Sequence, residues 1–106
     1  MPKIGENSLI GQSGKTYRMN VYTSDIQFND FIPGVYLMSS VDDAGEERYI
    51  FLGETDNIYP LLQKHPEQAK FDAENYNRIS FHMNASRDVR AAIIGDLLPT
   101  LKPVCN

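Results

Sequence analysis

The sequence predicts an α+β fold in which helices flank a small, mainly antiparallel sheet, with an extra β-hairpin at the N-terminus. Two observations carry this prediction. Short runs of alternating apolar and polar residues are separated by turn-forming residues, and two segments show helical spacing of apolar residues behind capping side chains. With 106 residues, 42% of them hydrophobic, the chain can form one compact core. We therefore expect residues 1–106 to form a single domain.

Two hairpins are expected in the first half of the chain. The first joins residues 9–10 to residues 17–22 through a turn rich in glycine and serine. The second joins the apolar runs 35–38 and 49–52 through a turn of acidic and small residues at 42–45. A further strand is expected at residues 78–83, where apolar and polar residues alternate.

The first predicted helix begins at Thr55 or Asp56, whose side chains can accept the hydrogen bonds of free backbone N–H groups. Pro60 then falls in the first turn, where a missing donor does little harm, and Pro66 closes the helix after His65.

A polar segment and a last helix complete the predicted layout. One or two helical turns are expected at residues 69–73, within the polar segment 67–76. Ser86 caps the last helix, and Pro99 and Pro103 limit its length. The apolar face of this helix is expected to carry Val89, Ile93, Leu97 and Leu98.

The charge of the chain weakens the case for non-specific binding to nucleic acid. Fourteen acidic residues against ten basic ones give a net charge of −4, which repels a phosphate backbone. The acidity is concentrated in residues 41–56, which hold six acids and one base. The turn between Val41 and Glu47 is therefore a candidate surface for steering a basic partner.

The composition also bears on compartment and cofactors. Cys105 is the single cysteine, so the chain forms no internal disulfide, and the two histidines lie far apart without zinc-ligand spacing. No apolar run approaches the length of a membrane span, and residues 1–5 lack the apolar segment of a signal peptide. We expect a cytoplasmic protein without a membrane segment and without a cofactor.

Three stretches of the chain match a known pattern in order and residue type. Four positions inside and after the second stretch, Thr55, Ile58, Leu62 and His65, keep the spacing of that pattern. The stretches are Gly34-Val35-Tyr36, Phe51-Leu52-Gly53-Glu54-Thr55-Asp56-Asn57 and Pro103-Val104-Cys105-Asn106. On these residues, the segment 34–106 resembles the GIY-YIG nuclease family. The resemblance implies a core at residues 34–106 and makes residues 1–30 an N-terminal hairpin extension.

The resemblance implies a phosphodiesterase frame from which the catalytic groups have been removed. Such nucleases use a glutamate to hold one divalent metal ion, an arginine on the phosphate and a tyrosine near the attacking water. This sequence has Phe51 at the position of the second tyrosine, Leu61 at the arginine and Ile94 at the glutamate. Mg²⁺ or Mn²⁺ would be needed only if the chain still cleaved nucleic acid.

Several residues keep the polar character of the family pattern or lie near it. Tyr36 matches the first tyrosine, and His65 matches a histidine found in part of the family, although both also fit plain packing roles. Tyr49 is expected on the strand face of Phe51, where its hydroxyl could substitute in part. Arg87 and Arg90 can contact phosphate or form surface ion pairs.

The main expectation is therefore a catalytically inactive GIY-YIG-like domain that binds a protein, with an inhibitory or regulatory role. The candidate binding residues are Tyr36, Tyr49, Phe51, Leu61, His65, Arg87, Arg90 and Ile94. Two alternatives remain open. One is a metal-dependent endonuclease with a rearranged site using Tyr36, His65, Lys64 and a carboxylate such as Glu54 or Glu74. The other is a non-cleaving nucleic-acid binder that uses Arg78, Arg87 and Arg90. The sequence leaves the oligomeric state undetermined.

Overall fold

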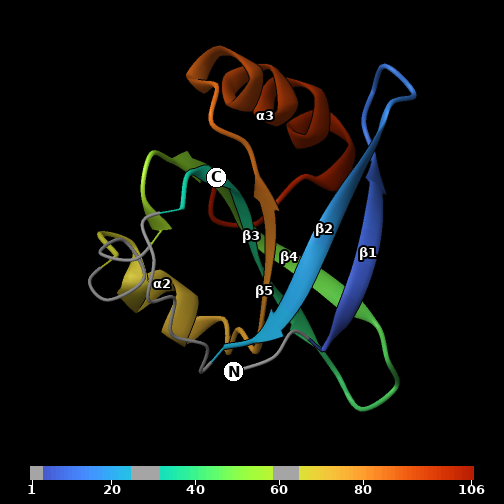
Figure 1. Cartoon of the computed structure of the whole chain (residues 1–106). Coiled ribbons are helices and arrows are strands. Elements are labelled where there is room, and N and C mark those ends of the chain that lie inside the picture. The colour runs from blue at the N-terminus through green and yellow to red at the C-terminus, as the bar shows by residue number, and fades with distance from the viewer. Residues whose placement is uncertain (1–3, 25–31, 59–64) are drawn as a thin grey trace.

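The fold is an α+β structure built on one five-stranded antiparallel sheet (Figure 1). The computed structural model describes residues 4–24, 32–58 and 65–106. The strands lie in the order β1-β2-β5-β3-β4. Their bounds are β1 Gly5–Ile10, β2 Thr16–Thr23, β3 Gly34–Val41, β4 Glu47–Thr55 and β5 Arg78–Met83, and the helices are α2 Gln68–Ala73 and α3 Arg87–Leu101. The predicted fold class is confirmed.

The sheet separates two apolar clusters, and one helix packs on each face. Along β3, Val35 and Leu37 belong to the cluster beneath α3, whereas Tyr36 and Met38 belong to the cluster around Phe71 of α2. This division follows from the strand period of two, which sends successive side chains to opposite faces. We call the two sides of the sheet the α3 face and the α2 face (Figure 1).

A β-bulge in the β3–β4 hairpin changes the predicted orientation of one side chain. Met38 pairs with Phe51, but the next pair along is Ser39 with Tyr49, so Ile50 is an extra residue. Ile50 and Phe51 consequently both pack on the α2 face, and Tyr49 packs on the α3 face. The expectation that Tyr49 shares the face of Phe51 is wrong, because it assumed uninterrupted alternation.

The N-terminal hairpin is part of the same sheet, since β2 pairs with β5. A polar contact also anchors its turn to α3. The Asp96 carboxylate accepts hydrogen bonds from the Ser13 backbone N–H at 2.8 Å, the Ser13 hydroxyl at 2.6 Å and the Tyr17 hydroxyl at 2.7 Å. A Cβ atom on Gly11 would lie 2.1 Å from an oxygen of Asp96, so the close approach requires glycine there.

The last helix begins as predicted but differs in its face and its end. Ser86 caps it by accepting the Val89 N–H at 3.3 Å. Val89, expected on the apolar face, is 44% exposed, and Arg90 is buried instead. The helix also continues past Pro99 to Leu101. A proline in the last turn removes only one backbone hydrogen bond, so the helix ends two residues later than the proline.

The other predicted elements can be compared only in part. The strand at residues 78–83 and the short helix around residues 69–73 are confirmed. Most of the first predicted helix falls on residues 59–64, which lie outside the described residues. Within the described ranges, no helix is long and apolar enough to cross a membrane.

Candidate functional site

Tyr36 and His65, which match the sequence pattern, meet two phenylalanines in an aromatic cluster on the α2 face. Tyr36 comes from β3, Phe51 from β4, Phe71 from α2, and His65 from the segment before α2. The ring centroid of His65 lies 5.7 Å from Tyr36, 5.5 Å from Phe51 and 4.6 Å from Phe71. These separations are those of packed aromatic rings. We call these four residues the aromatic cluster.

A hydrogen bond joins the two polar members of the aromatic cluster. The Tyr36 hydroxyl lies 2.8 Å from Nε2 of His65, and the Glu67 backbone N–H donates to Nδ1 of His65 at 2.9 Å. Because Nδ1 accepts a hydrogen bond, the proton of the neutral imidazole sits on Nε2. His65 therefore donates to Tyr36, and both ring nitrogens are occupied.

Burial keeps both groups uncharged. It lowers the pKa of His65, although the nearby carboxylate of Glu67 acts in the opposite direction. Burial also raises the pKa of the Tyr36 hydroxyl far above its ordinary value, and the negative charge of Glu54 adds to this effect. At neutral pH the pair is therefore a phenol and a neutral imidazole.

Gly53 makes room for the tyrosine. A Cβ atom at this position would lie 2.5 Å from the Tyr36 hydroxyl oxygen and 2.6 Å from Cζ. The glycine of the matched stretch therefore allows β4 to pass close to the ring on β3, its partner strand. This is a packing role.

The acidic residues proposed for a rearranged metal site are held by arginines. Glu54 and Asp56 both contact Arg90, and Glu74 accepts a hydrogen bond from Arg48 at 2.6 Å. Among residues 4–24, 32–58 and 65–106, no group of three or more histidine, cysteine, aspartate or glutamate side chains is arranged to hold a metal ion. Glu54, Asp56 and Glu74 are thus engaged in ion pairs with arginine side chains.

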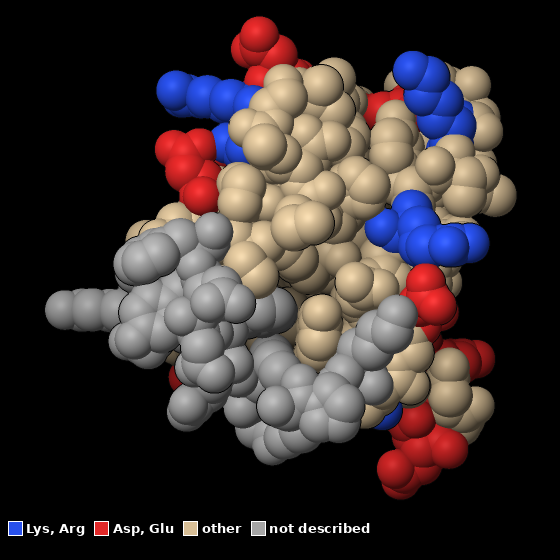
Figure 2. Space-filling model, viewed as in Figure 1, with Lys and Arg blue, Asp and Glu red and all other residues tan. Residues whose placement is uncertain are grey.

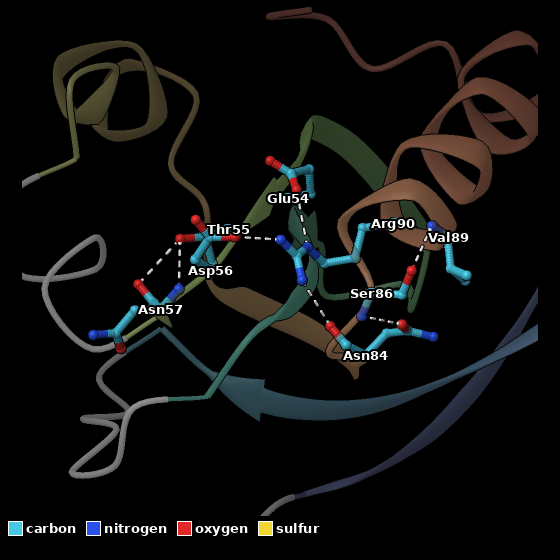
Figure 3. A network of polar contacts seen from close by, with 8 residues as sticks. All are labelled: Glu54, Thr55, Asp56, Asn57, Asn84, Ser86, Val89 and Arg90. Carbon is cyan, nitrogen blue, oxygen red and sulfur yellow. Dashed lines mark hydrogen bonds and ion pairs between the residues drawn. The ribbon is translucent and has the colours of Figure 1, made fainter.

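Arg90 is the buried centre of an ion-pair network that joins α3 to residues 54–56 at the end of β4 and to the β5–α3 connection (Figure 3). Its side chain is 1% exposed. Nε donates to Glu54 at 2.9 Å, NH1 donates to the Asn84 carbonyl at 3.0 Å, and NH2 donates to Asp56. A guanidinium surrounded in this way has its charge neutralised within the chain, so Arg90 is not presented to a phosphate.

The other predicted site residues are dispersed. Ile94 packs on the α3 face, on the opposite side of the sheet from Phe51. Arg87 is exposed on α3, and Arg78 donates to the Asn77 carbonyl at 3.1 Å. Leu61 and Lys64 lie outside the described residues. The structure therefore does not bring Phe51 and Ile94 into one cleft, and it separates Tyr49 and Arg90 from the aromatic cluster.

A groove that the sequence did not predict runs between α3 and the strands β2 and β5. It encloses about 420 Å³ and is mostly apolar. Within it, Nδ1 of His82 donates to the Arg18 carbonyl at 2.9 Å, which leaves Nε2 as an acceptor in the neutral ring. The lining residues are Lys15, Tyr17, His82, Asn84, Asp88, Val89, Ala92 and Ile93.

An exposed acidic turn forms the end of the β3–β4 hairpin. Asp42, Asp43 and Glu46 are exposed, and Figure 2 shows acidic side chains gathered at the lower right, where this hairpin turns. The Asp42 carboxylate accepts the N–H groups of Ala44 and Glu46, both at 2.9 Å, so it shapes the turn. Residues 41–47 are called the acidic hairpin below.

Comparison of the chain with protein-family models, with curated proteins and with solved structures gives no match. The function proposed below therefore rests on the contacts within the chain itself.

Proposed function

We propose that this chain is a non-catalytic domain of GIY-YIG type that binds another protein, in the cytoplasm. The observation that carries the proposal is the hydrogen bond between His65 and Tyr36, in which both groups are buried and neutral and both ring nitrogens of His65 are occupied. Tyr36 has a raised pKa and packs among aromatic rings. It therefore stabilises the contact between the sheet and His65.

The surrounding charges support the same function. Glu54 and Asp56 serve the buried Arg90, so neither is left to hold a catalytic metal ion. The apolar residues Phe51 and Ile94 replace polar groups of the family pattern and add packing area instead. A domain with these features keeps its fold but lacks the groups that the nuclease reaction needs.

The acidic hairpin is the surface we assign to partner binding. Its carboxylates project from a turn whose conformation is stabilised by Asp42. This turn closes the β3–β4 hairpin. A negatively charged protrusion attracts a positively charged surface and raises the rate of encounter. The partner we propose is therefore a protein with a basic recognition surface.

The proposal is tested by measuring cleavage and binding together. Labelled single- and double-stranded DNA and RNA are incubated with the protein and Mg²⁺ or Mn²⁺, using a chelator control and the Tyr36→Phe variant. We expect no cleavage by either protein. Metal-dependent cleavage that is lost in Tyr36→Phe would overturn the proposal in favour of a rearranged nuclease. A salt-dependent mobility shift would instead favour a nucleic-acid binder.

Partner binding is tested with charge-matched variants. Asp43→Asn with Glu46→Gln removes two charges from the acidic hairpin and keeps Asp42, which shapes the turn. Asp72→Asn with Asp88→Asn removes two exposed charges elsewhere. A partner identified by cross-linking is then purified and titrated against all three proteins. We expect weaker binding only for the hairpin variant, and equal weakening by both variants would exclude the hairpin as the contact.

A further inference from the structure

The groove beneath α3 lies between an apolar helix face and two rings on the sheet. Val89 is followed at three and four positions by Ala92 and Ile93, so these side chains share one face of the helix. Opposite them, the rings of Tyr17 and His82 meet edge to face, with their centroids 6.5 Å apart. A hollow of about 420 Å³ with mainly apolar walls is typical of a site for a small molecule.

One hydrogen-bond acceptor in the groove is left for a ligand. Nδ1 of His82 lies 2.9 Å from the Arg18 carbonyl oxygen, and this nitrogen must donate because a carbonyl oxygen only accepts. In the neutral ring, Nε2 is then an acceptor. Among the described residues, nothing donates a hydrogen bond to it. A ligand that carries an N–H group on its ring would satisfy this nitrogen.

The two ends of the groove differ in charge. It runs along α3 from Asp88 toward Asp96, a distance of about 12 Å along the helix axis. At the second end, hydrogen bonds from the first hairpin lower the pKa of Asp96, and the positive charge of Lys15, which lines the groove, adds to this effect. At the first end, the exposed Asp88 carboxylate has no hydrogen bond or ion pair within the part of the chain that the structure describes.

The two arginines of α3 do not neutralise Asp88. The guanidinium of Arg90 donates to Glu54 and Asp56 and points toward these carboxylates in Figure 3. Arg87 precedes Asp88 in the chain, but it does not line the groove, because successive residues of a helix point about 100° apart. The unbalanced charge of the groove is therefore negative and lies at its Asp88 end.

We propose that this groove binds a small aromatic amine that carries a positive charge. Its flat ring packs between α3 and the rings of Tyr17 and His82, its ring N–H donates to Nε2 of His82, and its ammonium group lies at Asp88. Aromatic rings favour both a flat aromatic partner and a nearby cation. An anionic ligand would meet an unpaired carboxylate on a chain of net charge −4.

A series of ligands tests each part of the proposal on the wild-type protein. Tryptamine is the probe, and isothermal titration calorimetry measures its Kd. 1-Methyltryptamine lacks the ring N–H and should bind roughly threefold to tenfold more weakly, the effect of one net hydrogen bond. Indole lacks the ammonium group and should bind about twofold to fivefold more weakly, the effect of an exposed ion pair. Indole-3-acetate, an anion, should bind more weakly than indole.

Matched variants locate the bound ligand. Ala91 and Ala92 are both exposed on α3, but only Ala92 lines the groove. Ala92→Phe should fill the groove and abolish binding, whereas Ala91→Phe should bind as the wild type does. Asp88→Asn should reduce the affinity for tryptamine to that for indole and leave indole unaffected. The control is Asp72→Asn, which removes an exposed charge from α2.

These outcomes decide the proposal. It would be overturned if tryptamine did not bind at millimolar concentration, or if indole-3-acetate bound as well as tryptamine. Equal binding by Ala91→Phe and Ala92→Phe would also exclude the groove. Thermal unfolding of each variant separates loss of binding from loss of folding, and the ligand series needs no variant. None of these measurements depends on whether the acidic hairpin binds a partner.

Discussion

The two faces of the sheet are stabilised by different kinds of interaction. On the α2 face, Tyr36 and His65 are joined by a hydrogen bond between neutral groups inside a set of packed rings. On the α3 face, the polar contacts are charged: Arg90 binds Glu54 and Asp56, and Asp96 binds the first hairpin. Arg90 and Asp96 thus join secondary-structure elements through charged contacts, whereas the Tyr36–His65 pair is neutral.

Under the proposed function, this difference explains why the packing residues of the matched pattern remain while its catalytic groups are absent. Packing positions of the pattern, such as Gly53 and Tyr36, are required by the close approach of β3 and β4 whether or not a reaction takes place. The matched pattern has polar residues at the positions of Phe51 and Ile94, and packing does not constrain these positions in the same way. The apolar side chains there add to the two clusters.

The largest expected effect comes from the buried charge. Replacing Arg90 by methionine keeps most of the side-chain volume but leaves Glu54, Asp56 and the Asn84 carbonyl without their shared donor. We expect a loss of about 2–3 kcal/mol in the free energy of unfolding from the lost hydrogen bonds between charged groups, because Glu54 and Asp56 are 31% and 85% exposed and stay partly hydrated without Arg90. Urea unfolding measures it, and Arg87→Met on the exposed side of the same helix should change little.

A smaller effect is expected on the α2 face. Tyr36→Phe removes one hydroxyl and leaves the Nε2–H of His65 buried without an acceptor, which should cost about 1–2 kcal/mol. Tyr17→Phe is the control on the α3 face, where Asp96 keeps its bonds to Ser13. If Tyr36→Phe were as stable as the wild type, the hydrogen bond between Tyr36 and His65 would contribute nothing to the free energy of unfolding.

The pH dependence of stability distinguishes the two faces further. Because burial lowers the pKa of His65, the unfolded chain takes up a proton at a higher pH than the folded chain. The free energy of unfolding should therefore be fully retained above about pH 6.5 and decline as the pH falls toward the folded pKa. His65→Phe should lack this part of the decline, and His82→Asn, which keeps His65, should show it.

The smallest expected effect is local. The hydrogen bonds from Ser13 and Tyr17 lower the pKa of Asp96, and they anchor only the turn of the first hairpin. Asp96→Asn should raise amide hydrogen exchange in β1 and β2 while leaving β3 and β4 protected. Uniformly faster exchange across the sheet would contradict the local role.

Whether a structural feature could be predicted from the sequence depends on how far apart in the chain its residues lie. Strand 78–83 and the Ser86 cap were correctly predicted, because alternation and capping are local signals. The bulge at Ile50 has no marker in the sequence, so the orientation of Tyr49 was missed. The bonds of Arg90 to Glu54 and of Asp96 to Ser13 join residues 36 and 83 positions apart, which no local pattern reveals.

The candidate site shows the same limit. The contact between Tyr36 and His65 depends on how the segment before α2 crosses the α2 face, and the sequence left open both a catalytic and a packing role for each residue. The groove beside His82 arises where α3 crosses β2 and β5, so it is a property of the assembled fold.

The most direct test of the account is the protonation of His65. Nitrogen-15 NMR of the imidazole ring reports which ring nitrogen carries the proton, and His65→Phe assigns the signals. We predict a neutral ring at neutral pH, protonated at Nε2 and bare at Nδ1, with signals unchanged by Mg²⁺. An imidazolium, a proton on Nδ1 or a shift on adding Mg²⁺ would contradict the claim that this pair is a neutral packing element.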